Sequence, residues 1–140
     1  MIDEQLLYIK RGNRITEITK TNRYQVSVEQ SIADLLNQEC LKDLSTLDGR
    51  LTAIRSIYHI NKNVPVYISP SVVLFQTSNK KAYDNVYVNA KNIRELFKDE
   101  DRTQIVFIDN TVLTVNKPYH LIKQYQEKCL KIRKPNRDYL

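Results

Sequence analysis

The chain of 140 residues is 41% hydrophobic and 27% charged, which is typical of a folded soluble domain. It has only two glycines and no apolar run of about 18 residues, which excludes a glycine-rich phosphate loop and a membrane-spanning helix. The acidic N-terminus is not typical of a signal peptide, so we expect the two cysteines to be free thiols in a cytoplasmic protein.

The net charge of +6 is concentrated in two stretches of the chain. Residues 49–91 carry six basic and one acidic side chain, and residues 116–140 carry seven and two. If folding brings these stretches to one face, that face would attract a nucleic-acid backbone through counterion release. A solvated surface with a basic tail explains the same composition, so charge alone leaves both interpretations open.

The N-terminal third predicts a hairpin and then a long helix. The stretch Leu6–Ile18 alternates weakly around a turn, which is typical of a two-stranded hairpin. A helix is predicted over about residues 28–48, because apolar residues recur there at steps of three and four. Ser27 and Gln30 form a capping-box pattern before it, and Gly49 is placed to end it.

The middle of the chain predicts strands. Arg50–Ile60 is rich in β-branched and aromatic residues, which favours a strand although its apolar residues do not alternate cleanly. Pro65–Ser69 and Val72–Thr77 are predicted strands on either side of Pro70, which cannot donate to a β-ladder. A polar loop follows them at Thr77–Asn85.

The C-terminal third predicts more strands and a second helix. Val86–Ile93 is a predicted strand with a bend, and Arg94–Arg102 is a predicted helical turn or loop. Thr103–Val115 predicts a hairpin, and residues 118–132 predict a helix with one apolar stripe. Residues 133–140 predict a basic, flexible tail.

Together these elements predict an α+β fold of mainly antiparallel strands and hairpins with two helices, at about 28–48 and 118–132. The length and the absence of linkers predict a single domain over residues 1–132.

The sequence offers little support for catalysis or metal binding. Two cysteines and two histidines, Cys40, His59, His120 and Cys129, have none of the spacings typical of a zinc site. Both cysteines lie on apolar stripes, which favours core packing over a nucleophile. We therefore expect no enzyme activity, no metal and no cofactor.

Basic and amide side chains at strand ends and in loops are stronger candidates. Lysine and arginine bind phosphates, and asparagine and arginine also read base edges. No helix-turn-helix pair is apparent and aromatic interleaving is weak, so contacts would come from loops or strand ends. The candidate DNA-binding residues are Arg50, Arg55, Asn61, Lys62, Lys80, Lys81, Asn89, Lys91, Asn116 and Lys117.

Several stretches in fixed order carry a resemblance to a known family. They are "SIADLLNQECLKDLSTLDGR", "PVYISPS" followed by "LFQTS", "NVYVNAKNI" and "IVFIDNTVLTVNKPYHLIKQY". From about Arg23 to Cys129 the chain resembles the ComK family, the competence transcription factors of Gram-positive bacteria. It departs from the family's pattern at Gln76 and Tyr87, where the family tends to have proline and tryptophan.

The resemblance implies a DNA-binding activator in the bacterial cytoplasm and nucleoid. It implies double-stranded, A/T-rich target boxes, competence (DNA-uptake) target genes, assembly from dimers and a regulatory adaptor protein as a further partner. The C-terminal half also resembles LytTR DNA-binding domains, which implies groove contacts from Asn89, Lys91, Asn116 and Lys117. An alternative is a truncated ComK-like interaction protein that modulates a full-length regulator without reading DNA.

Overall fold

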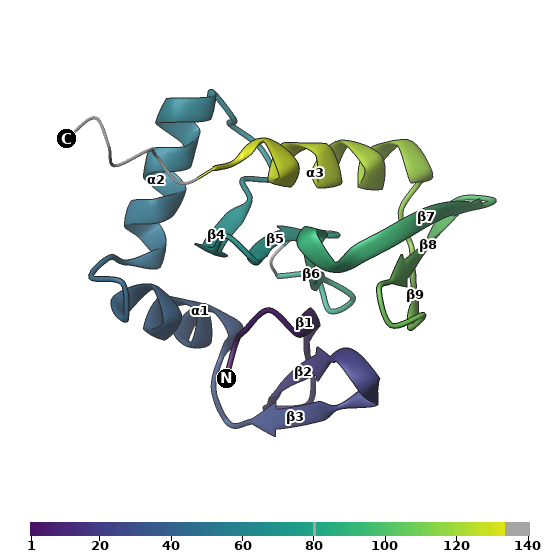
Figure 1. Ribbon diagram of the computed structural model, residues 1–140, viewed down its shortest axis with the longest axis horizontal. Coiled ribbons are helices and arrows are strands. Elements are labelled where there is room, and N and C mark those ends of the chain that lie inside the picture. The colour runs from purple at the N-terminus through teal and green to yellow at the C-terminus, as the bar shows by residue number, and fades with distance from the viewer. Residues whose placement is uncertain (80, 134–140) are drawn as a thin grey trace.

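A computed structural model describes residues 1–79 and 81–133. Within them the chain is α+β, with two antiparallel sheets and three α-helices (Figure 1). The strands are β1 (Leu6–Arg11), β2 (Thr16–Lys20), β3 (Gln25–Val28), β4 (Val66–Ser69), β5 (Val72–Gln76), β6 (Val86–Asn89), β7 (Ile93–Asp99), β8 (Arg102–Phe107) and β9 (Val112–Val115). The helices are α1 (Ile32–Leu41), α2 (Leu47–Tyr58) and α3 (Tyr119–Lys131), with 3₁₀ turns η1 (Thr21–Arg23) and η2 (Ala90–Asn92).

The larger sheet has the strand order β3-β2-β1-β6-β5-β4, and the smaller has the order β7-β8-β9. β1 lies in the centre of the larger sheet, between its hairpin partner β2 and the distant β6, where Tyr8 pairs with Val88. In Figure 1, α3 runs along one side of the larger sheet towards α2, and the smaller sheet lies at the other end of α3. This arrangement confirms the predicted α+β class with mainly antiparallel strands.

Each face of the larger sheet has its own hydrophobic core. In β5, Val73 and Phe75 pack on the side of α3 and the smaller sheet. Val72 and Leu74 pack on the opposite side, against α1. Because both faces are covered, β5 is buried from Val72 to Phe75, which explains its unbroken run of apolar residues.

The prediction of one helix over residues 28–48 is wrong. α1 ends at Leu41, and the backbone then turns through Leu44, whose φ is 60°. The hydroxyl oxygen of Thr46 accepts a hydrogen bond from the Gly49 N–H at 3.0 Å and caps a new helix, α2. Gly49 therefore lies in the first turn of α2 instead of ending a helix.

Two further expectations in this region are also wrong. The residue that caps α1 is Ser31, whose Oγ accepts from the Asp34 N–H at 3.1 Å, and not Ser27. The predicted strand Arg50–Ile60 lies mostly in α2. Its β-branched residues favour a strand only weakly, and packing of one helical face against the cores decides the outcome.

The stretch Arg94–Arg102, predicted as a helical turn or loop, belongs to the β7–β8 hairpin. A tight turn between the strands holds Glu100 at φ 55°. The predicted N-terminal hairpin, the strands on either side of Pro70 and the hairpin within Thr103–Val115 are confirmed, as is the second helix, as α3. Of the predicted tail, only Arg133 falls within the described residues.

Candidate nucleic-acid interface

The first candidate site residue is a buried structural amide. Asn89 ends β6 and is 0% exposed. Its Oδ1 accepts hydrogen bonds from the backbone N–H groups of Val73 and Lys91, both at 3.2 Å. Its Nδ2 donates to the carbonyl oxygens of Leu6 and Ser71, at 3.0 and 3.1 Å. Because both ends of the amide are engaged inside the chain, Asn89 holds the backbone and is not placed to read a base.

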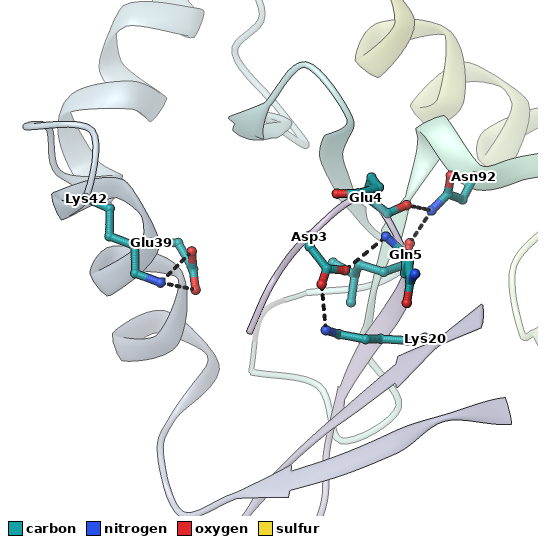
Figure 2. Close-up of polar contacts among 8 residues, drawn as sticks. Asp3, Glu4, Gln5, Lys20, Glu39, Lys42 and Asn92 are labelled. Atoms are coloured by element: carbon teal, nitrogen blue, oxygen red, sulfur yellow. Dashed lines mark hydrogen bonds and ion pairs between the residues drawn. The ribbon is translucent and has the colours of Figure 1, made fainter. Parts of the chain in front are cut away.

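A second amide completes this corner of the fold. Asn92 Nδ2 donates to the carbonyl oxygens of Glu4 and Leu6, at 2.8 and 2.7 Å, and thereby ties η2 to the N-terminal segment (Figure 2). That segment is held in turn by the ion pair of Asp3 with Lys20, at 3.0 Å. Of the two residues between Asn89 and Asn92, Ala90 is buried and Lys91 is exposed. We call Asn89–Asn92 the amide corner. Because the hydrogen bonds of its two asparagines fix the backbone, the exposed Lys91 has a defined position.

Arg50 is likewise committed within the chain. Its Nε donates to Ser45 Oγ at 2.7 Å, and its Nη2 contacts Asp43 Oδ2 at 3.1 Å. Its Nη1 donates to the carbonyl oxygens of Tyr67 and Ile68, at 2.8 and 2.9 Å, on the outer strand β4. All three guanidinium nitrogens are used, so we assign Arg50 a structural role in joining α2 to the sheet edge.

Two of the predicted lysines, Lys62 and Lys91, belong to segments that contact α3. Lys128 Nζ donates to the carbonyl oxygen of Lys62 at 3.2 Å. The 3₁₀ turn η2, which contains Lys91, also packs against α3. Burial raises the pKa of the Cys129 thiol to about 12, and the charges of Lys91 and Lys128 act in the opposite direction. We call Lys62, Lys91 and Lys128 the α3 basic patch.

A second basic group lies at the tip of the N-terminal hairpin. Arg11 Nη2 donates to the carbonyl oxygen of Lys81 at 3.3 Å, and its guanidinium carbon lies 5.9 Å from the centre of the Tyr83 ring. Arg14, exposed in the same turn with φ 60°, lines a cavity of about 380 Å³ together with Arg11. We call Arg11, Arg14 and Lys81 the hairpin basic patch.

The two patches lie at opposite ends of β6. Lys10, next to Arg11, pairs with the first residue of β6, Val86, whereas Lys91 follows the last. A strand of that length spans roughly 13 Å. Among residues 1–79 and 81–133, the two patches therefore lie a strand's length apart.

The remaining candidates belong to neither patch. Arg55 is exposed on α2, and Asn61 is exposed beside Lys62. Asn116 is exposed before α3, and the carbonyl oxygen of Lys117 accepts from Thr103 Oγ1 at 2.8 Å. Lys80 lies outside the described residues.

Sequence reasoning missed Arg11, Arg14 and Lys128. The first two had a signal, since "KRGNR" places three basic residues around a predicted turn. The sequence signal for Lys128 was weaker, since Lys128 is only a basic residue in the last turn of a helix. Its meeting with Lys62 depends on the tertiary packing of α3, which no local pattern reveals.

The described residues contain no group of three side chains that could hold a metal ion. Both thiols are buried, and burial raises the pKa of Cys40 as it does that of Cys129. A raised pKa disfavours the reactive thiolate, which supports packing roles for both cysteines. As far as residues 1–79 and 81–133 are concerned, the helices are too short or too polar to span a bilayer.

Comparison with known proteins gives the class of the chain. The model of the ComK family, described as ComK protein, matches residues 6–137. That class is one of competence transcription factors and not of enzymes. The chain belongs to the ComK family. Neither the search of curated proteins nor that of solved structures finds a match, and the likeness to LytTR domains stays a prediction.

Proposed function

We propose that this ComK-family chain binds double-stranded, A/T-rich DNA and activates competence genes. The observation that carries the proposal is the family match over residues 6–137. In this proposal the chain acts in the cytoplasm at the nucleoid, as a dimer or larger assembly that a regulatory adaptor protein also recognises.

The two basic patches support DNA contact at two points. Lys62 and Lys91 reach solvent at the end of α3, and Arg11 and Lys81 reach it at the hairpin tip. Side chains held at two points some distance apart can contact phosphates on both sides of a groove, which sets the register of a protein on DNA. In this proposal the two patches provide affinity for DNA, whether or not any side chain also reads a base.

Arg14 is the side chain best placed to supply the A/T preference. It is exposed at the tip of the hairpin turn, beyond the body of the sheet. Narrow minor grooves of A/T tracts have a strongly negative potential that attracts inserted arginines. The proposal therefore assigns phosphate contacts to the lysines and groove insertion to Arg14.

The test is a salt series of binding to an A/T-rich duplex, followed by fluorescence anisotropy. If all six patch residues contact phosphates or the groove, the log–log salt slope is about −5. Replacing the α3 basic patch by alanine (Lys62→Ala, Lys91→Ala, Lys128→Ala) should reduce the slope by about 2.7 units, and replacing the hairpin patch should do the same.

Lys42→Ala is the matched control. Lys42 is an exposed lysine at the C-cap of α1, is paired with Glu39 at 3.1 Å and belongs to neither patch. Its slope should equal that of the wild type. If both triple variants have the same salt slope as the wild type, the two patches do not belong to the DNA interface. An absence of binding at micromolar protein would favour the interaction-protein alternative.

A further inference from the structure

The cavity of about 380 Å³ that Arg11 and Arg14 line has the size of a small-molecule site. It lies between the β1–β2 turn and the segment that joins β3 to α1. Sites for small organic ligands usually have volumes of about 300–1,000 Å³. Since one water takes up about 30 Å³ in the liquid, the cavity has room for a molecule much larger than a single ion.

Hydrogen bonds within the chain hold the walls of this cavity in place. The Gly12 N–H donates to the Ile15 carbonyl oxygen at 2.9 Å and closes the hairpin turn. Thr16 Oγ1 donates to the Gln30 carbonyl oxygen and so joins the hairpin to the segment before α1. The cavity is therefore formed before any ligand enters, which lowers the free-energy cost of binding one.

Tyr87 of β6 supplies an unpaired hydroxyl to this cavity. Tyr87 is 8% exposed, belongs to the core on the side of α1, and lines the cavity. Its hydroxyl has no hydrogen-bond partner among residues 1–79 and 81–133, where the Tyr67 hydroxyl is the only fully enclosed side-chain oxygen or nitrogen without a partner. The Tyr87 hydroxyl thus keeps some accessible surface, and we place that surface in the cavity.

The mouth of the cavity attracts negative charge. Arg14 is exposed and forms no ion pair within the described part of the chain, and Arg11 uses one guanidinium nitrogen on a backbone carbonyl. The first turn of α1 lies at the same cavity, where Ser31 Oγ caps the Asp34 N–H. The Ile32 N–H has no partner among the described residues, and free N–H groups at a helix N-terminus favour an anion.

The lining between mouth and floor indicates what else the ligand contains. Ile15 and Ile32 are apolar and partly buried, and Glu29 adds one exposed carboxylate. An inorganic phosphate would leave the isoleucines and the Tyr87 hydroxyl without contacts. A mononucleotide matches every feature, because its phosphate is an anion, its base has apolar faces, and its ribose hydroxyls and base N–H groups can donate to Glu29 and Tyr87.

We propose that this cavity binds a mononucleotide, with its phosphate at Arg14 and the N-terminus of α1 and its base against Ile15 and Ile32, next to the Tyr87 hydroxyl. Nucleotide binding here goes beyond the proposed DNA binding and does not depend on it, since Ile32 and Tyr87 belong to neither basic patch. One consequence does rest on the proposed function. Arg14 cannot hold a nucleotide phosphate and enter a DNA groove at once, so the nucleotide would compete with DNA.

Amide NMR titrations without DNA test the proposal, with AMP, GMP, CMP and UMP as probes. At least one of the four should shift the Gly12 and Ile32 amide signals saturably, with a dissociation constant below about 1 mM. Inorganic phosphate and the corresponding nucleoside should each bind at least about tenfold more weakly, because each fills only part of the cavity.

Two substitutions with matched controls test the placement of the ligand. Tyr87→Phe should raise the dissociation constant about fivefold, because it removes one hydrogen bond and keeps the ring. Its control is Tyr24→Phe, at a 59% exposed tyrosine that does not line the cavity. Arg14→Ala should raise the constant at least about tenfold, whereas Arg94→Ala, at an exposed residue of β7, should leave it unchanged.

Three results would overturn the proposal. They are no saturable shift with any of the four nucleotides at about 10 mM, inorganic phosphate binding as tightly as the best nucleotide, and a Tyr87→Phe variant that binds like the wild type. Because no DNA is present, each of these failures is distinct from a failure of the proposed DNA binding.

Discussion

Lys62 and Lys91 reach the same end of α3 from two loops that are built differently. The amide corner, Asn89–Asn92, is held by six buried or part-buried side-chain hydrogen bonds. The loop before β4 is shaped by backbone conformation, with His59 at φ 56° and Asn63 at φ 51°. Asparagine thus has a different structural role in each loop. In the amide corner its side chain holds the backbone through hydrogen bonds, whereas in the loop before β4 Asn63 adopts a positive φ.

The largest expected effect breaks the amide corner. Asn89→Ala should lower the free energy of unfolding by about 3 kcal/mol, because it leaves several buried backbone groups without partners. Urea denaturation followed by circular dichroism measures the change. Asn61→Ala, at an exposed residue of the other loop, is the control and should stay within about 0.5 kcal/mol of the wild type. Equal losses in the two variants would contradict the distinction between the loops.

A smaller effect tests the loop before β4. Asn63→Val should cost about 1 kcal/mol, since a β-branched residue at φ 51° is sterically strained. Asn63→Gly should leave stability nearly unchanged, because glycine adopts positive φ without strain. The same urea experiment measures both. If valine is tolerated as well as glycine, backbone conformation does not shape this loop.

The smallest effect concerns the ion pair that supports the amide corner. Burial acts to raise the pKa of Asp3, but the hydrogen bond and charge of Lys20 and the Gln5 N–H outweigh it, so the pKa lies below its ordinary value of 3.8. A carboxyl group whose pKa is lowered by folding stabilises the fold above pH 3.8, and this contribution is lost as the pH falls through the folded-state pKa.

Asp3→Asn should therefore make stability less dependent on pH below about pH 4, with a difference under about 1 kcal/mol because the Asp3 side chain is 46% exposed. Unfolding in urea at a series of acidic pH values measures this dependence. Asp109, whose pKa is also lowered, remains in the variant and preserves part of the slope. A variant with the full wild-type slope would show that Asp3 contributes nothing to acid sensitivity.

Much of the fold could be predicted from local patterns, because most strands are bounded by prolines and turns. The helical region could not. Arg50–Ile60 has β-branched residues that favour a strand, and its α-helical conformation depends on apolar partners that lie elsewhere in the chain. The break at Leu44 was hidden because the apolar spacing of the two helices continues across it.

The candidate site was predictable only in part. That lysines would be exposed followed from their charge, as Lys62, Lys81 and Lys91 show. The internal hydrogen bonds of Asn89 and Arg50 could not be predicted in this way, because their partners are backbone groups that only folding brings close. Polar residues at strand ends therefore divide into structural and exposed sets only once the sheet order is known.

The central place of β1 has a consequence for how the protein is made. The pairing of Tyr8 with Val88 means that one edge of β1 has no partner until β6 has left the ribosome. At about 5–20 residues per second, this delay is on the order of ten seconds. During synthesis the N-terminal hairpin thus exposes an unpaired strand edge that attracts other extended chains. A chaperone that binds the hairpin early would protect this strand edge until β6 pairs with β1.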